Sequence, residues 1–306
     1  MPSENGPMIK RIIDISEQAY VHMKHKQLYI DKKSETVAII PIEDLGVLIL
    51  QHPAIVISQS VIIACQENNV VIVFCDTRHL PYSVILPLTE GNSLHAKILK
   101  EQIQVPLPTR KRLWQQIVKQ KITAQIKTLE DTGKNGKALK HLVKKVKTGD
   151  SENHEAQAAQ KYWPLLMGKP FRRDTGADGI NALLNYGYAI LRAVVARAIV
   201  GSGLHPALGL HHHNQYNGLC LADDLMEPFR PWVDFQVCQL MAENDPVKIE
   251  TETKTKLLAL LSHPVEMQGL NMPMMVSCHY LTATLKRAFQ DKKIKLDYPV
   301  LKTPET

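Results

Sequence analysis

Hydrophobic residues follow two different periods along the chain, and the change occurs near residue 90. Between Ile12 and Leu88, Ile and Val gather in short runs separated by turn-forming or polar residues, which is typical of β-strands. Residues 58–69, SQSVIIACQENN, instead have helical spacing, with Ser58 or Ser60 as the N-cap. The pattern predicts a small β domain with one short helix in residues 1–90. The expected strands are QLYIDKK, TVAIIPI, LGVLIL, AIVIS and VVIVFCD.

Residues 81–93, PYSVILPLTEGNS, contain two prolines and a glycine, and we expect them to be the exit from this domain. Beyond Asn92, apolar residues recur at three- and four-residue spacing with lysines between them, which predicts helices. The segments with this spacing are LHAKILKEQIQ, KRLWQQIVKQKITAQIKTLE and KALKHLVKKVK. We therefore expect an α+β protein with an all-α domain in residues 91–290 and a loose tail in residues 291–306.

Residues 181–203, NALLNYGYAILRAVVARAIVGSG, are apolar on every side, which predicts a helix in the core of the second domain. The length of this segment and its two arginines, Arg192 and Arg197, argue against a membrane span. The N-terminal residues MPSENGPMIKR are polar and lack the apolar core of a signal peptide. Five scattered cysteines without a CxxC motif argue against a disulfide framework or a zinc knuckle. A cytoplasmic protein is expected.

Positive charge is concentrated in one segment of the chain. The formal net charge is +7. Residues 97–150 carry 14 Lys and Arg against 4 Asp and Glu, a local +10, so the rest of the chain sums to −3 (7 − 10). This concentration suggests a polyanionic partner, because each neutralised phosphate releases counterions. A solvated helix face that keeps the protein soluble would give the same composition.

Three adjacent histidines, His211 to His213, end the segment SGLHPALGLHHHN. The glycines around Pro206 are typical of a fixed turn that delivers a side chain to a defined place. Adjacent residues cannot all point at one ion, so at most one or two of the three could be metal ligands. A solvated loop is the alternative interpretation.

Two carboxylates follow this run. Asp224 and Glu227 are three residues apart, which puts both on one face of a helix or helical turn. Pro228 and Pro231 exclude a continuous helix through them but fit the first turn of a new helix. Oxygen ligands at this spacing suit a hard cation such as Mg²⁺ or Mn²⁺. Alternatively, the acidic turn complements a helix dipole, which is worth about 0.3–1 kcal/mol.

A third carboxylate lies upstream in GDSENHEAQAAQKYW. His154 and Glu155 invite comparison with the HExxH zinc helix, but Ala158 occupies the position of its second histidine. What remains is one glutamate on a helix with small neighbours that would admit a large ligand, or a surface glutamate near a helix start. The chain has no GxSxG, GxxxxGK(S/T) or GxGxxG motif, and the apolar neighbours of Cys220 indicate a packed thiol.

Three stretches together resemble the signature blocks of the CRISPR-associated Cas1 integrase family, in order and spacing. They are ENHEAQAAQKYW, GLHPALGLHHHNQYN and LADDLMEPFRPWVD. IPIEDLGVLILQHPAIVIS followed by ENNVVIVFCD resembles the N-terminal β domain of the same family. The resemblance extends over roughly residues 9–288 and is strongest to the Cas1 proteins of type II systems.

The resemblance implies a catalytic, metal-binding set of residues. The family's glutamate in its E-x-x-A-A-x-x-Y block falls on Glu155, its histidine falls on His212, and its acidic residue before PFRP falls on Glu227. The separation of 15 residues between His212 and Glu227 fits the family and favours the middle histidine of the run. Asp224 is expected to be an alternate ligand or to support the ligands.

The implied activity is DNA strand transfer, in which the 3′-hydroxyl of a captured prespacer duplex attacks a phosphodiester of the CRISPR repeat. Mg²⁺ or Mn²⁺ is the expected cofactor, and the basic segment would grip the DNA backbone. Arg230 is either a further contact near the site or an ion-pair partner of Asp234. The DNA-binding candidates are Arg110, Lys111, Lys140, Lys144, Lys147, Arg172 and Arg173.

The resemblance also implies partners: a homodimer formed through the β domain, and a dimer of the Cas2 subunit that bridges two such dimers. Two other functions remain compatible with the residues. One is a stand-alone metal-dependent DNA endonuclease with the same ligands, in which water is the nucleophile. The other is a non-catalytic DNA-binding scaffold, whose acidic and histidine residues cap helices.

Overall fold

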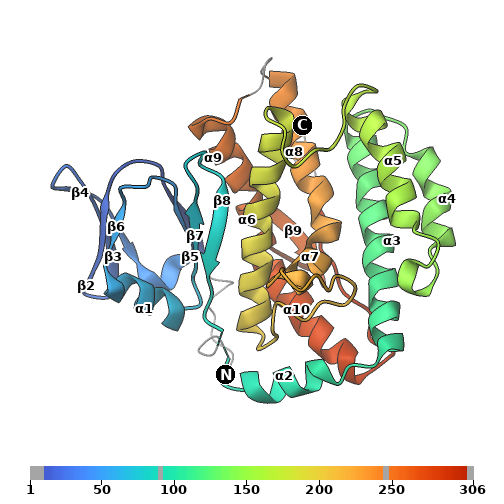
Figure 1. Ribbon diagram of the computed structural model, residues 1–306, viewed down its shortest axis with the longest axis horizontal. Coiled ribbons are helices and arrows are strands. Elements are labelled where there is room, and N and C mark those ends of the chain that lie inside the picture. The colour runs from blue at the N-terminus through green and yellow to red at the C-terminus, as the bar shows by residue number, and fades with distance from the viewer. Residues whose placement is uncertain (1–9, 89–91, 244–247, 302–306) are drawn as a thin grey trace.

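The structure is a computed structural model that describes residues 10–88, 92–243 and 248–301. Two β-sheets form its N-terminal part, and a mostly helical part follows (Figure 1). The expected α+β class is confirmed. The helical part also contains a three-stranded sheet, of order β10-β9-β11, so the expectation of an all-α domain is wrong.

The N-terminal part is a sandwich of two four-stranded sheets, of order β1-β5-β7-β8 and β4-β3-β2-β6. Helix α1 (Gln59–Glu67) begins after Ser58, as the helical spacing predicted, and it buries Val61 and Cys65. The strands are β1 (Arg11–Ile15), β2 (Tyr20–Lys24), β3 (Gln27–Lys32), β4 (Glu35–Pro41), β5 (Leu45–Leu50), β6 (Val56–Ile57), β7 (Val71–Cys75) and β8 (Pro81–Ile85), with the short 3₁₀ helix η1 (Ile42–Asp44) before β5.

The unbroken apolar run LGVLIL forms strand β5, which is buried on both faces. All six of its residues are buried, and it pairs in parallel with both β1 and β7. Leu48 and Leu50 pack into the core between the two sheets, whereas Val47 and Ile49 pack into the larger core shared with the helices. A sheet covered on both faces requires apolar residues at every position, not at alternate ones.

The strand prediction was incomplete. Strands β1 and β2 were not expected, and only Val56 and Ile57 of the run AIVIS form a strand. Residues 81–85, expected as part of the exit from the domain, form β8, which pairs antiparallel with β7. Pro81 is tolerated because it begins an edge strand, where its missing N–H costs little.

The helical part is built around α6 (Ile180–Gly201), which contacts β7, β8 and the helices α7 to α10. This helix is long and apolar enough to cross a membrane, but 83% of its most apolar window is buried inside the protein, in agreement with a core helix. A Cβ at Gly187 would lie 2.5 Å from Val233 Cγ1, so glycine permits the close approach of α8. The other helices are α2 (His95–Ile103), α3 (Leu107–Asp131), α4 (Lys137–Lys145), η2 (Thr148–Asp150), α5 (His154–Met167), α7 (Cys220–Met226), η3 (Glu227–Phe229), α8 (Arg230–Glu243), α9 (Thr251–Ala259), η4 (Leu260–Ser262) and α10 (Met274–Gln290).

The described part of the expected loose tail is packed against the helical part. β11 (Val300–Leu301) pairs with β9 (Pro264–Met267), which also pairs with β10 (Leu270–Pro273). Leu296 is buried, and the hydroxyl of Tyr298 donates a hydrogen bond of 3.3 Å to the carbonyl of Leu225. The expectation of a loose tail is therefore wrong for residues 294–301, because apolar side chains anchor them.

Candidate functional site

The N-terminus of α5 fixes the position of Glu155. Asn153 is the N-cap of α5, and the side chain of Asp150 accepts hydrogen bonds of 2.9 Å from the backbone N–H groups of His154 and Glu155, which the helix itself leaves unpaired. Gly149 and Asp150 have positive φ angles of 74° and 47°, which turn the chain from η2 into the helix. Glu155 is consequently held in the first turn of α5, with its side chain 23% exposed.

The histidine loop is held in place by Asp224. This residue is fully buried, and its two oxygens accept the backbone N–H groups of Leu210, His211 and His212 at 2.6, 3.0 and 3.2 Å. A Cβ at Gly209 would lie 2.2 Å from the carbonyl oxygen of His212 and 2.9 Å from Asp224 Oδ2. Only glycine allows so tight a loop. Asp224 therefore positions the histidine loop.

Asp224 also orients the imidazole of His212. Nδ1 of His212 lies 2.6 Å from Asp224 Oδ1, and a carboxylate only accepts, so Nδ1–H donates and Nε2 keeps its lone pair. His211 is stacked on Trp114, with ring centroids 4.2 Å apart and planes 2° from parallel. The two histidines are thus held differently, and only His212 has its imidazole oriented by the carboxylate of Asp224.

Arg192 on α6 anchors the far end of this loop. Its guanidinium donates to Asp223 Oδ1 at 2.6 Å, to Asp223 Oδ2 at 2.9 Å and to Asn217 Oδ1 at 2.6 Å. The two adjacent aspartates consequently have separate tasks: Asp223 ties the loop to the core helix, whereas Asp224 shapes the turn around His212.

Glu227 occupies the first position of η3 and is 5% exposed. Pro228 and Pro231 follow it at the start of a new helical segment, as predicted. Arg230 Nε lies 2.9 Å from Glu227 Oε1. Arg230 was considered as an ion-pair partner of Asp234; it pairs with Glu227 instead, because the carboxylate of Asp234 accepts the hydroxyl groups of two buried tyrosines.

Lys121, on α3, joins the two glutamates. Its ammonium lies 2.6 Å from Glu155 Oε1 and is in ion-pair contact with Glu227 Oε2. The side chains of Lys121 and Glu227 are only 13% and 6% exposed. Carboxylates that are 72 residues apart in sequence (227 − 155) therefore meet at one cation.

The ion pairs keep these groups charged. Burial alone would raise the pKa of Glu227, but the charges of Lys121 and Arg230 outweigh it and lower that pKa. Burial opposes the charge of Lys121, yet Glu227 and Glu155 raise its pKa above the ordinary value. The hydrogen bond to Asp224 raises the pKa of His212, and the nearby charge of Glu227 adds to the effect. Burial lowers the pKa of His211.

The two carboxylates and the imidazole are residue types that fit a hard divalent cation. In this structure, however, they are not arranged around a common point as metal ligands. Two carboxylates that converge on one point, with an oriented imidazole beside them, are a donor set suited to Mg²⁺ or Mn²⁺. Within the described residues, no group of three or more His, Cys, Asp or Glu side chains is arranged to hold a metal ion. The point of convergence is held by the ammonium of Lys121.

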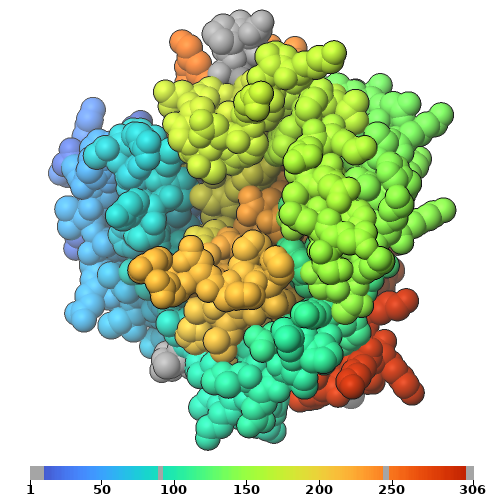
Figure 2. Space-filling view, turned by 45° about the vertical axis from the view of Figure 1, so that its right-hand side comes forward, coloured from blue at the N-terminus to red at the C-terminus, as the bar shows by residue number. Residues whose placement is uncertain are grey.

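The predicted DNA-binding residues fall into two regions. Lys144 and Lys147, with Lys119 and Lys145, line an open hollow that reaches Glu152, three residues before Glu155. Arg110 instead lines a cavity of about 310 Å³ whose lining includes His212. A further hollow is seen in Figure 2, between the gold loop before α7 and the light-green residues of α5.

The remaining candidates have local partners or lie on the surface. Lys140 pairs with Glu130 at 2.8 Å, and Lys147 pairs with Glu152. Arg173 donates to Asn181 Oδ1 at 2.9 Å and to Asn185 Oδ1 at 2.5 Å, so it holds the segment before α6 together. Lys111 and Arg172 are exposed.

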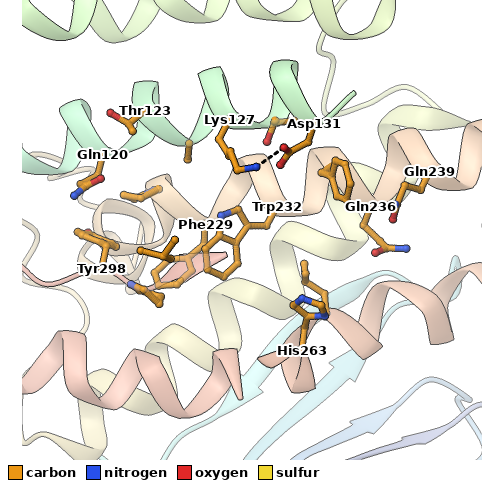
Figure 3. Close-up of a pocket in the computed structure, with 17 residues that line it drawn as sticks. Gln120, Thr123, Lys127, Asp131, Phe229, Trp232, Gln236, Gln239, His263 and Tyr298 are labelled. Atoms are coloured by element: carbon orange, nitrogen blue, oxygen red, sulfur yellow. Dashed lines mark hydrogen bonds and ion pairs between the residues drawn. The ribbon is translucent and has the colours of Figure 1, made fainter. Parts of the chain in front are cut away.

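The structure has a separate apolar cavity of about 300 Å³ between α3, α8 and β11 (Figure 3). Phe229, Trp232 and Tyr298 line it, and the ion pair of Lys127 with Asp131 lies at its edge (Figure 3). Its described lining includes none of the predicted metal ligands.

Sequence reasoning missed three residues that shape the site: Lys121, Asp150 and Trp114. Lys121 was one of 14 cations in residues 97–150, and nothing in its local sequence separates it from the others. The start of α5 had a signal that could have been used, because Asn153 directly before it is a preferred N-cap residue, and Asp150 lies one turn upstream. The contact of Trp114 with His211 joins residues 97 positions apart (211 − 114), beyond the reach of any local pattern.

Residues 13–263 match the protein family described as CRISPR associated protein Cas1. A CRISPR-associated endonuclease Cas1 of Neisseria meningitidis serogroup C (strain 8013) is 33% identical over 302 residues, which cover 97% of each chain. A solved casposase bound to integration product has a TM-score of 0.78 at 20% identity, and the match covers 97% of this chain and 96% of that one. A Cas6-RT-Cas1--Cas2 complex has a TM-score of 0.74 at 16% identity, and the match covers 99% of this chain and 38% of that one. These two structures share the fold.

Proposed function

This chain belongs to the Cas1 family of CRISPR-associated proteins, and from that premise we propose that Glu155, His212 and Glu227 hold one divalent ion for DNA strand transfer. The chain is an endonuclease and integrase of CRISPR adaptation. One observation carries the proposal about its site: Glu155 and Glu227, brought from different helices, converge on a single cation, and the oriented imidazole of His212 lies close enough to Glu227 for its charge to act on the carboxylate.

The residues of the chain have separate tasks in this reaction. Glu155 and Glu227 offer carboxylate oxygens, and His212 offers the lone pair of Nε2. Asp224 fixes the imidazole and the loop, so it supports the site without needing to bind the ion. A bound Mg²⁺ or Mn²⁺ supplies Lewis-acid stabilisation of the phosphoryl oxygen and lowers the pKa of the attacking hydroxyl.

The reaction exchanges one phosphodiester for another. The 3′-oxygen of the prespacer forms a bond to phosphorus, and the bond from that phosphorus to the 3′-oxygen of the repeat strand breaks. The attacking hydroxyl loses its proton to solvent, and the departing 3′-oxygen takes one up. No nucleotide hydrolysis is needed, because the bonds made and broken are of the same kind.

DNA would reach the site along its basic borders. The hollow lined by Lys119, Lys144, Lys145 and Lys147 ends beside the turn that leads into α5, which suits a DNA backbone running toward Glu155. Arg110 stands on the other side, in the cavity shared with His212. The solved casposase is described as bound to integration product, which supports DNA as the partner of this chain.

We propose a homodimer formed through the outer face of the sheet β4-β3-β2-β6, in the cytoplasm. Val37, Ile39 and Tyr20 are 54%, 48% and 47% exposed on this part of the chain, an unusual share of apolar surface for a solvated sheet. A Cas2 dimer bridging two such dimers is supported by the fold shared with a Cas1–Cas2 complex. The five free thiols suit a reducing compartment.

The test is a strand-transfer assay. A labelled duplex with free 3′-hydroxyl ends is incubated with a supercoiled plasmid that carries a repeat, Mn²⁺ or Mg²⁺, and the partner subunit or none. We expect metal-dependent joining of label to plasmid. His212→Ala and Glu227→Gln should each reduce joining by at least about a hundredfold, because the Lewis-acid contribution is several kcal/mol.

A matched control is Glu243→Gln, which removes a carboxylate at the exposed end of α8 and should leave joining unchanged. Nicking or degradation of plasmid without joining would favour the stand-alone endonuclease. Binding of DNA with no chemistry in any condition, and no difference between the variants and the native chain, would leave only a basic scaffold.

A further inference from the structure

We propose that Lys121 is a built-in cation that occupies the metal position of the metal-free enzyme and must leave when the divalent ion binds. The inference rests on the proposed function, because it concerns the same carboxylates. Lys121 then has a task other than DNA binding. Its ammonium stabilises the metal-free protein and thereby lowers the affinity of the site for the divalent ion.

The geometry makes the two cations mutually exclusive. Lys121 Nζ lies 2.6 Å from Glu155 Oε1 and is in contact with Glu227 Oε2. A Mg²⁺ ion bound by these same two oxygens would lie about 2.0–2.1 Å from each, at nearly the same point. An ammonium group and a metal ion cannot share that point, since their repulsion would add to the steric overlap.

The burial of the group explains why a cation is needed there at all. Glu227 is 5% exposed, and two ionised carboxylates facing each other without a counter-charge would be strongly destabilising. The ammonium neutralises this repulsion and holds Glu155 and Glu227 together before the metal arrives. Arg230 Nε lies 2.9 Å from Oε1 of Glu227, whereas the ammonium of Lys121 contacts Oε2.

Metal binding therefore breaks the ion pairs of Lys121 with Glu155 and Glu227. The free energy lost with these ion pairs makes the free energy of metal binding less favourable. Linkage makes the consequence reciprocal: whatever stabilises the metal-free fold through Lys121 weakens metal binding by the same amount. Removing the ammonium should thus destabilise the metal-free protein and tighten the metal complex.

The experiment measures Mn²⁺ affinity by titration calorimetry and the melting temperature with and without Mn²⁺, in the absence of DNA. Lys121→Met should lower the melting temperature of the metal-free protein and bind Mn²⁺ at least about tenfold more tightly than the native chain. The rise in melting temperature on adding Mn²⁺ should be larger in the variant. Lys121→Gln, which keeps hydrogen-bond donors without the charge, serves if Lys121→Met does not fold.

Lys161→Gln is the matched control, because it removes one exposed positive charge from α5 and should leave both readouts unchanged. A folded Lys121→Gln protein with native or weaker Mn²⁺ affinity would overturn the inference and leave the proposed function standing. Glu227→Gln tests that function separately. Native Mn²⁺ affinity in Glu227→Gln, or no Mn²⁺ binding by the native chain and the Lys121 variants alike, would overturn both.

Discussion

Asp234 illustrates how burial alters a single residue close to the site. It is 2% exposed, and it accepts a hydrogen bond of 2.8 Å from the hydroxyl of Tyr162 and another from the hydroxyl of Tyr188. Arg230, which sequence reasoning considered as its ion-pair partner, lies over the ring of Tyr188 at 4.8 Å and pairs with Glu227. Burial therefore acts on Asp234 without a directly paired positive charge, and it raises the pKa to about 7.

This raised pKa predicts a pH dependence of stability. The folded state holds the proton of Asp234 more tightly than the unfolded chain, so the stabilising contribution is complete below the ordinary pKa of 3.8 and is lost as pH rises toward about 7. Asp234→Asn lacks this titration. Between pH 4 and pH 8 the native chain loses this contribution and the Asn variant does not. We therefore expect the melting temperature of Asp234→Asn, relative to that of the native chain, to rise over this pH range.

The control for this measurement is Asp178→Asn, an exposed carboxylate just before α6. Its melting temperature should follow that of the native chain across the same pH range. A constant difference between Asp234→Asn and the native chain would mean that Asp234 stays ionised in the folded state.

At the scale of elements, helical spacing predicted α2, α3 and α4, but α9 and α10 were not singled out, and the strands were predicted incompletely. Helix α4 buries Leu139 and Leu142 and exposes its lysines, which is the division that its spacing indicated. Strand β1 escaped prediction because Arg11 and Asp14 interrupt its short apolar run, and its place is defined only by parallel pairing with β5. A strand is stabilised by partners distant in sequence, and local patterns do not record them.

Helix α4 carries the prediction that belongs to this scale. Lys140 and Lys144 lie four residues apart on its exposed face, beside the hollow that leads to Glu155. In the double variant Lys140→Gln/Lys144→Gln, the slope of log affinity for duplex DNA against log salt should fall by about 0.9 for each lost phosphate contact. Lys33→Gln, in the turn between β3 and β4, should leave the slope unchanged. An unaltered slope in the double variant would exclude these lysines from the interface.

At the scale of the whole molecule, one face of the sandwich carries exposed apolar side chains: Tyr20, Val37 and Ile39 are 47%, 54% and 48% exposed in the part of the chain that the structure describes. Ile39 of β4 is in register with Tyr29 of β3, which is in register with His22 of β2, so these side chains form a row across the outer face. The rings of His22 and Tyr29 are stacked at 5.3 Å. The opposite face of the same strands is buried in the core between the sheets, so a dimer through this sheet would use its outer face.

A charge placed on this face should prevent dimerisation without unfolding the chain. Val37→Lys/Ile39→Lys changes two side chains that are 54% and 48% exposed, so the cost to the folded monomer should be small. We expect light scattering to report the native chain as a dimer and the variant as a monomer, with melting temperatures within a few degrees. Thr123→Lys, on the exposed side of α3, is the control that should remain dimeric. A dimeric double variant would mean that the partner binds elsewhere.

The sequence by itself determined the class of the fold, the core helix and the candidate ligands Glu155, His212 and Glu227, because these depend on local periodicity and on blocks of contiguous residues. Only the tertiary structure revealed that Lys121 lies between the two glutamates, that Asp224 orients His212, and that residues 294–301 are packed. These are contacts between segments remote in sequence. An ion pair or a hydrogen bond across such a distance forms only when the packing of helices and sheets has brought its two ends together, and no local pattern of residues specifies that.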